Sequence, residues 1–355
     1  MVIAARGVVA VRVIRACRDL GFAAVAVYDD ADVWAPHAGL ADEAYALAGA
    51  GGYADIAALI AIARRAGADA VHPGDGPVAL DADAAAAVRD RGLTWIGAAR
   101  RPPATPAAAP EERAQVDLLA GTAGVVSLGA RITAASRRGI PVCTHTAPRE
   151  TRDELAERAR AVAAELGFRG YGVAEFGRRA GGDWRFLGMS THLASEHAVA
   201  EEQSGVDIVA AQLALAFDAG APLPRVLKDN WACGVALEAE DRARGALRAA
   251  GIVRSFRLPA GPGVRVDPAL GEGQVIVPTR DNRLAFVTVC ARTEDEARQR
   301  LARAAGEISV HGVTTTAWLP DAPVAADPAF TDTAPDTGIV SLEARGGAPV
   351  RLALR

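Results

Sequence analysis

"VIAARGVVAVRVIRACRDLGFAAVAVYD", residues 2–29, determines the fold of the first part of the chain. The apolar runs at its two ends predict strands, and the helical spacing of the apolar positions between them predicts an amphipathic helix that ends at Gly21. A strand, a helix and a second strand in this order indicate a parallel pair joined by a crossover. The arginines that interrupt the stretch argue against a secretory signal.

The same alternation continues to Gly97. Helices are expected within residues 53–67 and 80–92, and strands within residues 69–74 and 93–97. We therefore predict an α/β fold for residues 1–97, a doubly wound, Rossmann-like parallel sheet with helices on both faces. Residues 98–114 ("AARRPPATPAAAPEERA") are rich in proline and small residues and are expected to form a linker.

A different pattern occupies residues 115–355, for which we predict an α+β domain with a mostly antiparallel sheet. A hairpin is expected at 171–190, where two apolar runs flank a glycine-containing turn. A helix is expected from Thr151 to Gly167, with Thr151 as its N-cap. Further helices are expected within residues 205–220 and 293–308.

Composition excludes several functional classes. The 39 basic and 43 acidic residues give a net charge of −4 without a basic tract, so nucleic-acid binding is not expected. No apolar run approaches the ~20 residues that a membrane span requires. The four cysteines lack the spacing of a metal site and are expected to be reduced, in a soluble cytoplasmic protein without a bound metal.

The densest group of chemically useful side chains lies in "GMSTHLASEHAVAEE", residues 188–202. It holds two histidines and three carboxylates, although several neighbouring positions are Gly, Ser or Ala. His72, which precedes Pro73 at the end of an expected strand, is interpreted as a structural residue that bonds the turn.

Several motifs in one order give the chain its resemblance to a known family. They include "ADEAYAL" (41–47), "LGFRGYGVAEF" (166–176), "THLASEHAVAEEQSGVDIV" (191–209), "RLPAGPGVRVD" (257–267) and "HGVTTT" (311–316). Together they resemble the biotin carboxylase family of ATP-grasp enzymes, from residue 2 to about residue 342. The resemblance implies the family's N-terminal domain, an ATP-grasp core and the family's C-terminal domain.

The chain departs from the family where the family binds nucleotide. A separate lid domain, with a glycine-rich loop and lysines that hold ATP phosphates, is expected to be missing. Only residues 98–124 separate "LTWIG" from "VVSLGAR", the strand that resembles the one after the lid, and Lys228 is the only lysine in the chain. Of three metal-binding positions, Glu175 keeps its carboxylate, whereas the other two are Gly188 and Ser190. One carboxylate does not make a Mg²⁺–nucleotide site.

A further departure falls on one strand, where the family's charged positions are Gly234 and Ala236.

The resemblance also implies the catalytic residues. Glu196 matches the general base, Arg265 matches the arginine that steadies the enolate form of biotin, and His192 replaces the bicarbonate-binding arginine. A glutamate base near a guanidinium suits proton abstraction next to a carbonyl group. A structural ion pair between Glu196 and Arg265 remains an equally weighted alternative.

Additional residues are assigned to substrate binding or to a dimer interface. The substrate-binding candidates are His197, Glu175, Arg137, Arg138 and Trp184. The residues that resemble the family's interface salt bridge are Arg15 and Asp19, so a homodimer is expected. Packing for Trp184 and a solvated edge for the two adjacent arginines are the alternatives.

From these departures we predict a repurposed, ATP-independent enzyme that requires no ATP, Mg²⁺ or biotin. The expected reaction is enolate chemistry such as cyclisation, aldol or Dieckmann condensation, dehydration or decarboxylation. The expected substrate is a biosynthetic intermediate such as a polyketide, either a small molecule or bound to a carrier protein.

Two other functions remain open. One is a non-catalytic subunit or scaffold, and the other, ranked last, is an ATP-dependent biotin carboxylase.

Overall fold

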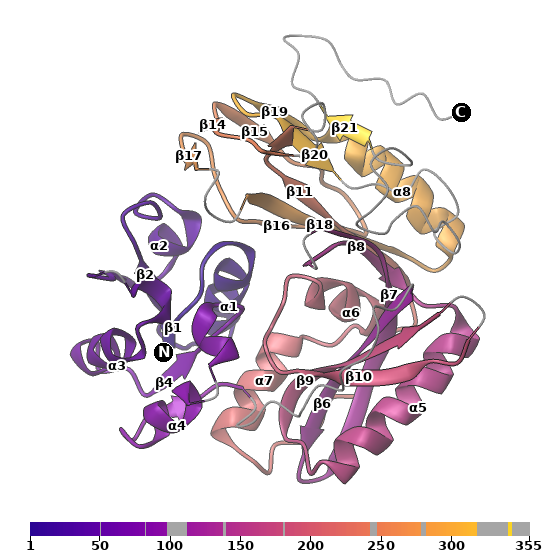
Figure 1. Cartoon of the computed structure of the whole chain (residues 1–355), viewed down its shortest axis with the longest axis horizontal. Coiled ribbons are helices and arrows are strands. Elements are labelled where there is room, and N and C mark those ends of the chain that lie inside the picture. The colour runs from indigo at the N-terminus through magenta and orange to yellow at the C-terminus, as the bar shows by residue number, and fades with distance from the viewer. Residues whose placement is uncertain are drawn as a thin grey trace.

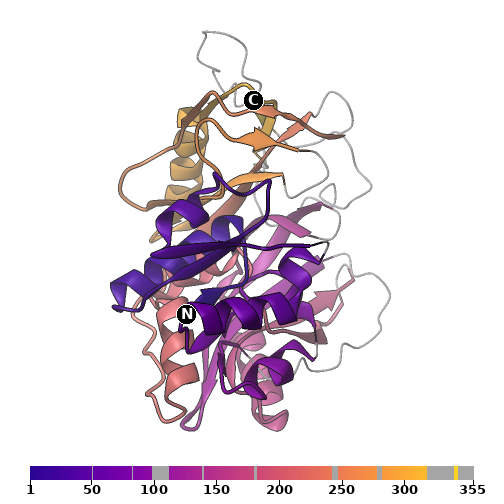
Figure 2. The ribbon, with the colours of Figure 1, turned by 90° about the vertical axis from the view of Figure 1, so that its left-hand side faces the viewer.

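The computed structural model arranges the chain as a first unit with a parallel sheet and a long antiparallel sheet with helices (Figure 1). It describes residues 1–49, 51–81, 83–97, 112–137, 140–179, 182–241, 247–277, 282–317 and 340–342. In the turned view the first unit lies in front, with the long sheet behind it (Figure 2). The predicted fold class is confirmed.

The first unit is a five-stranded parallel sheet in the order β3-β2-β1-β4-β5. Its strands are β1 (Val2–Ile3), β2 (Val25–Tyr28), β3 (Glu43–Ala46), β4 (Ala70–His72) and β5 (Thr94–Trp95). Its helices are α1 (Gly7–Asp19), α2 (Pro36–Leu40), α3 (Ile56–Arg65) and α4 (Ala84–Arg89), with 3-10 turns at Gly52–Ala54 and Pro77–Leu80. Helix α1 ends as predicted: Leu20 caps it and Gly21 follows at φ 75°, a left-handed conformation that favours glycine.

The second part is built on one continuous antiparallel path of eight strands, β10-β9-β6-β7-β8-β11-β18-β16. These strands are β6 (Glu112–Gly121), β7 (Gly124–Arg137), β8 (Ile140–Thr146), β9 (Gly170–Arg178), β10 (Arg185–Ser190), β11 (Trp231–Glu238), β16 (Val264–Pro268) and β18 (Arg283–Ala291). The expected hairpin is β9–β10. At the far end, β20 (Thr315–Ala317) pairs with β11 and β21 (Val340–Leu342) pairs with β20.

Short two-stranded ladders and four helices complete this part. The ladders join β12 (Glu240–Asp241) to β13 (Leu247–Arg248), β14 (Gly251–Ile252) to β17 (Val275–Ile276), and β15 (Ser255–Arg257) to β19 (Ser309–His311). The helices are α5 (Arg149–Glu165), α6 (His197–Ser204), α7 (Ile208–Phe217) and α8 (Glu294–Glu307).

Two predicted boundaries are corrected by the structure. The linker was predicted to end at residue 114, but β6 already begins at Glu112 and its first residues pair with β9; residues 98–111 lie outside the described part of the chain. Thr151 is not an N-cap, because α5 begins at Arg149 after Pro148. Pro148 has an extended backbone at the N-cap position, so the helix begins earlier in the sequence than predicted.

Helix α6 lies directly on the long sheet because glycines on two strands leave room for it. A Cβ atom at Gly129 of β7 would meet the side chain of Gln203. A Cβ at Gly234 of β11 would lie 2.6 Å from a methyl group of Val199 and 2.5 Å from the ring of Phe286. These close approaches fix the position of α6, and thus of the residues at its N-terminus.

One hydrophobic core joins the first unit to the second part. It contains Val9 and Val13 of α1 together with Leu119 of β6, Tyr171 of β9 and Leu213 of α7. The apolar stripe of α1 that the sequence predicts therefore packs outward onto the second part as well as onto its own sheet, because α1 contacts both α7 and β16.

A buried imidazole ties β4 to α7. The backbone N–H of Gly74 donates to Nδ1 of His72 at 2.9 Å, and Nε2 of His72 lies 3.2 Å from Oε1 of Gln212. His72 is fully buried, and desolvation lowers its pKa to about 4. The interpretation of His72 as a residue that bonds its turn is confirmed.

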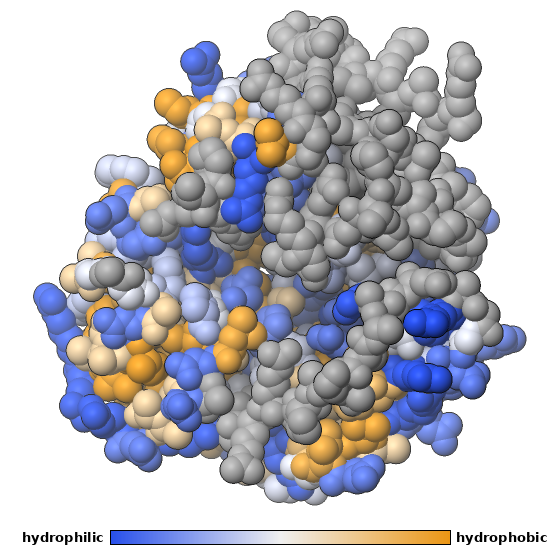
Figure 3. Space-filling model, viewed as in Figure 1, coloured by the Kyte–Doolittle hydropathy of each residue, from blue (hydrophilic) through white to orange (hydrophobic). Residues whose placement is uncertain are grey.

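On the face shown in Figure 3, hydrophobic side chains occur in separate groups among hydrophilic ones wherever the chain is described. No helix in the described ranges is both long and apolar enough to cross a bilayer.

Replacement of Gly234 by alanine is expected to destabilise the fold by about 1–3 kcal/mol, because the added methyl group overlaps Val199 and Phe286. Urea unfolding measures this change. Gly271→Ala is the matched control, because nothing lies within 4 Å of a Cβ atom there. Equal stabilities of the two variants would contradict the close packing of α6.

The stability of the protein is expected to fall between pH 6.5 and pH 4 partly through His72. Its pKa is lower in the folded chain than in the unfolded chain, so the unfolded chain binds more protons in this window. The contribution is complete above pH 6.5 and is lost as the pH approaches 4, by at most about 3 kcal/mol. Urea unfolding of His72→Asn should show a shallower pH dependence than the original chain; an identical slope would refute the assignment.

Candidate active site

The carboxylate of Glu201, on α6, is the centre of a buried ion cluster. It lies 3.0 Å from Nη2 of Arg12 on α1 and 2.5 Å from Nη1 of Arg265 on β16. The backbone N–H of Ile208, at the start of α7, also donates to it at 2.8 Å. Its side chain is only 5% exposed, so three distant parts of the chain meet at one desolvated charge.

The charges in this cluster hold each other in the ionised state. Burial alone would raise the pKa of Glu201, but the neighbouring His197, Arg265 and Arg12 side chains lower it to about 2. Burial opposes the charged form of Arg265 as well, yet Glu201 and Asp267 raise its pKa above the ordinary value. Asp267 accepts from Nε of Arg265 at 2.7 Å, so two carboxylates fix the direction of this guanidinium.

Glu196 lies at the N-cap position of α6 and is buried. Its Oε1 atom has no hydrogen-bond partner among the described residues and lies 3.9 Å from Nη1 of Arg283, on β18. The same guanidinium nitrogen donates to Oγ of Ser195 at 2.8 Å. An oxygen atom of Glu196 that makes no hydrogen bond is available to accept a proton.

The two histidines of the segment have different surroundings. His197 is fully buried; its Nδ1 donates to the carbonyl oxygen of Ala194 at 2.7 Å, and desolvation lowers its pKa. Its Nε2 atom faces Glu201 at 3.7 Å. His192 is half-buried at the site's rim, with Nδ1 2.7 Å from Oγ of Ser190.

A second buried polar group occupies the strands of the sheet next to α6. Asp117 of β6 accepts from the hydroxyl of Tyr171 at 2.6 Å and from Nη1 of Arg131 at 3.2 Å. Desolvation raises the pKa of Asp117, opposed by Arg131. Asp117 also interacts electrostatically with Glu196 and His197, so polar groups continue from α6 into the sheet.

Glu196 and Arg265, the predicted catalytic residues, form ion pairs with other residues and not with each other. Arg265 binds Glu201 and Asp267, whereas the ion pair of Glu196 is with Arg283. A structural ion pair between Glu196 and Arg265 is therefore not observed among the described residues. Both residues nevertheless lie in the polar region around α6.

Glu175, the one carboxylate expected at the three metal-binding positions, lies on β9. Glu175 of β9 stands opposite Gly188 of β10, and Ser190 follows on the same strand. Within the described ranges, no group of three or more His, Cys, Asp or Glu side chains is arranged to hold a metal ion.

Other candidates lie away from this region or outside the described residues. Trp184 is 3% exposed in the hydrophobic core beneath the guanidinium of Arg178, which favours the packing alternative for this residue. Arg138 lies outside the described residues, and Arg137 is described only as the end of β7.

The two residues predicted to lie at a dimer interface, Arg15 and Asp19, are both on α1. Arg15 pairs with Asp267 of its own chain at 3.7 Å, and Asp19 is exposed.

Sequence reasoning missed Glu201, Arg12 and Arg283. The available signal was the occurrence of charged residues at positions that the helical or strand period assigns to a buried face. Arg12 lies on the apolar stripe of α1, and Glu201 follows His197 by four residues, one turn of the same helix.

Three family models match the chain in order. Residues 1–102 match the biotin carboxylase N-terminal domain, residues 140–226 match the ATP binding domain of the carbamoyl-phosphate synthase L chain, and residues 235–342 match the biotin carboxylase C-terminal domain.

Relatives of known name agree with these matches. The biotin-dependent acyl-coenzyme A carboxylase alpha3 subunit of Mycobacterium leprae is 32% identical, in an alignment that covers 93% of this chain and 71% of the relative. Biotin carboxylase 1 of Bacillus subtilis is 26% identical over 89% of this chain and 92% of its own. A solved biotin carboxylase domain of a single-chain bacterial carboxylase is 28% identical, with a TM-score of 0.78 over 88% and 90% of the two chains.

These findings overturn the functional prediction made from the sequence. An ATP-independent cyclase, lyase or other enolate enzyme, a non-catalytic subunit, and a protein without need of ATP, Mg²⁺ or biotin are all contradicted. The ATP-binding domain model matches residues 140–226, and the relatives are named as biotin carboxylases and biotin-dependent carboxylase subunits. Single positions such as Gly188 and Ser190 say less about activity than the match of the whole chain does. The chain belongs to the biotin carboxylase family.

Proposed function

We propose that this chain is the biotin carboxylase component of a biotin-dependent carboxylase and uses ATP to carboxylate biotin with bicarbonate. The observation that carries the proposal is the match of residues 140–226 to an ATP-binding domain model, between matches to the two biotin carboxylase domains. The relatives at 26–32% identity carry the corresponding names.

Glu196 is the proposed general base. Its burial excludes bulk water, and Oε1 makes no hydrogen bond within the described part of the chain, which leaves a lone pair for a proton from bicarbonate. Nη1 of Arg283 lies 3.9 Å from the same oxygen atom and so places a positive charge beside the proposed base.

Arg265 is the proposed group that steadies the enolate form of biotin. Glu201 and Asp267 fix two edges of its guanidinium, while Nη2 has no partner in the described ranges and can donate to a substrate oxygen. A donor held in place before the reaction needs no reorganisation when negative charge develops. His192 and Glu175 are proposed to line the entrance to this site, and His197 to support the helix that carries it.

We further propose that the family's lid domain is absent. β5 ends at Trp95 and β6 begins at Glu112, which leaves few residues between them. The alignment with the M. leprae subunit spans 430 positions, more than the 355 residues of this chain, so the relative carries residues without a counterpart here.

The described residues offer few ligands for the Mg²⁺ ion that would accompany the nucleotide. Glu175 faces a glycine on β10, and Ser190 offers a hydroxyl where a charged or amide oxygen would serve Mg²⁺ better. These residues do not form a complete Mg²⁺ site, and no catalytic step is assigned to the metal.

We propose that biotin reaches the site attached to a carrier. The single lysine in the sequence, Lys228, follows a leucine and so does not belong to a Met-Lys pair of the kind that accepts biotin. A homodimer through the first unit is proposed as well, with the exposed end of α1, including Asp19, as part of the interface.

Glu196→Gln is expected to lower kcat for biotin-dependent ATP hydrolysis at least about 100-fold, because the amide cannot accept the proton. The KM for ATP should change little, since Glu196 is not proposed to bind nucleotide. Steady-state assays with bicarbonate and free biotin measure both constants, and thermal unfolding checks the fold.

Glu157→Gln, an exposed change on α5, is the control and should match the original chain. Full turnover by Glu196→Gln would eliminate Glu196 as the base.

ATP is expected to bind at least tenfold more weakly than it binds B. subtilis biotin carboxylase 1. The loss of one charged hydrogen bond to phosphate is worth about 1.5–3 kcal/mol, which corresponds to tenfold or more in affinity. Titration calorimetry of both proteins with ATP and Mg²⁺ gives the comparison. Equal affinities would contradict the missing lid, whereas complete absence of binding together with absence of turnover would contradict the proposed function itself.

A further inference from the structure

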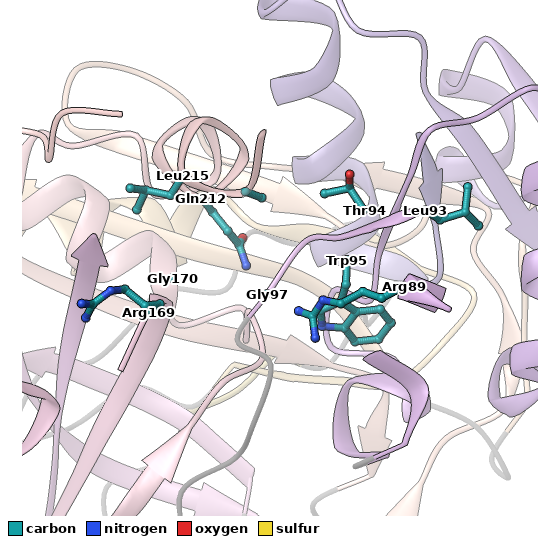
Figure 4. Close-up of a pocket in the computed structure, with 10 residues that line it drawn as sticks. Arg89, Leu93, Thr94, Trp95, Gly97, Arg169, Gly170, Gln212 and Leu215 are labelled. Carbon is teal, nitrogen blue, oxygen red and sulfur yellow. The ribbon is translucent and has the colours of Figure 1, made fainter. Parts of the chain in front are cut away.

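A cavity of ≈ 420 Å³ lies between the first unit and the second part, and its lining residues include none of the carboxylate cluster on α6. Its walls come from the end of α4 and from β5, from the start of β9, and from α7 (Figure 4). None of its described lining residues has a role in the proposed carboxylation. Its volume is within the range of about 300–1,000 Å³ that small-molecule sites occupy.

The orientation of Gln212 in this cavity is fixed by His72. Because Nδ1 of His72 accepts from the Gly74 N–H, the neutral ring carries its proton on Nε2. That proton must point to an acceptor, so the atom of Gln212 at 3.2 Å is its carbonyl oxygen. The amide NH₂ group is left facing the cavity, as Figure 4 shows, although the residue as a whole is only 3% exposed.

Trp95 supplies a second donor. A Cβ atom at Gly97 would lie 3.2 Å from the indole Nε1, so the missing side chain keeps the N–H edge of the ring uncovered. Gly97 also has φ 153°, which L residues rarely adopt. The rest of the indole is buried in the core of the first unit, and the ring is therefore a rigid part of the wall.

The charged groups of the cavity are cations. Figure 4 shows the guanidinium of Arg89 beside the ring of Trp95, and Arg169 on the opposite wall. Arg169 donates to the carbonyl oxygen of Phe168 at 2.8 Å. Among the described residues, neither arginine has a carboxylate within ion-pair distance, and no Asp or Glu lines the cavity. The lining therefore offers donors and positive charge together with the apolar side chains of Leu93 and Leu215.

We propose that this cavity binds a small organic anion, with a phosphate or carboxylate group at Arg89, Gln212 and the Trp95 N–H, and an apolar part against Leu215 and Ala216 of α7. A charged acceptor strengthens each of these hydrogen bonds. The site is separate from the carboxylation site, so binding here neither requires nor implies turnover there.

The test is a titration of the full chain followed through the indole N–H resonances in a ¹⁵N spectrum. Trp95→Phe identifies the Trp95 signal by its loss. Phenyl phosphate and phenylacetate probe the two anionic groups, inorganic phosphate probes the charge alone, and benzyl alcohol probes the apolar part alone. The Trp95 resonance should move with at least one ring-bearing anion, at a dissociation constant at least fivefold lower than that of benzyl alcohol.

Arg89→Gln should weaken binding of the anion at least fivefold, whereas Arg91→Gln should leave it within twofold. Arg91 is an exposed arginine next to α4 that does not line the cavity. Ala216→Phe should abolish binding by filling the space; if this variant does not fold, the pair of arginine variants decides. Equal binding of anions and alcohol, equal effects of the two arginine variants, or an unmoved Trp95 resonance at millimolar probe would each overturn the proposal.

Discussion

The ion cluster around Glu201 is the interaction on which the rest of the molecule depends. One buried carboxylate receives Arg12 from the first unit, Arg265 from β16 and the backbone N–H that starts α7. Withdrawing a carboxylate from water is costly, and this cost is offset only when several donors meet it in good geometry. The relative placement of the first unit, α6 and the edge of the long sheet is thus tied to a set of charges that must all be present together.

The same cluster prepares the chemistry of the site. Arg265 has its direction set by Glu201 and Asp267 and keeps one nitrogen free, and Glu196 keeps one oxygen free at the N-terminus of the helix that Glu201 anchors. Helix α6 and its N-cap therefore hold both the residue that anchors the ion cluster and the proposed general base. The nucleotide side of the chain shows no comparable concentration of charge in its described residues, because Glu175 faces Gly188 across the hairpin.

Much of the fold was predictable from local sequence patterns, because period and turn residues act over a few positions. The parallel first unit, the β9–β10 hairpin and the end of α1 before Gly21 were all recovered. The start of α5 was not, since Pro148 displaced the expected cap at Thr151.

The site was only partly predictable. Glu196 and Glu201 lie on one short helix five residues apart and thus face different neighbours, and sequence spacing does not tell which carboxylate meets Arg265. The function inferred from missing ligands was wrong because single positions were weighed above the continuous match of the chain to carboxylases.

The packing above Gly234 limits how the sequence of this protein can change. Val199 and Phe286 fill the volume that any side chain at position 234 would enter. A larger residue there would force two buried hydrophobic groups apart, so it requires compensating changes on neighbouring elements. Substitutions at this point of β11 are therefore coupled to substitutions on β18 and α6.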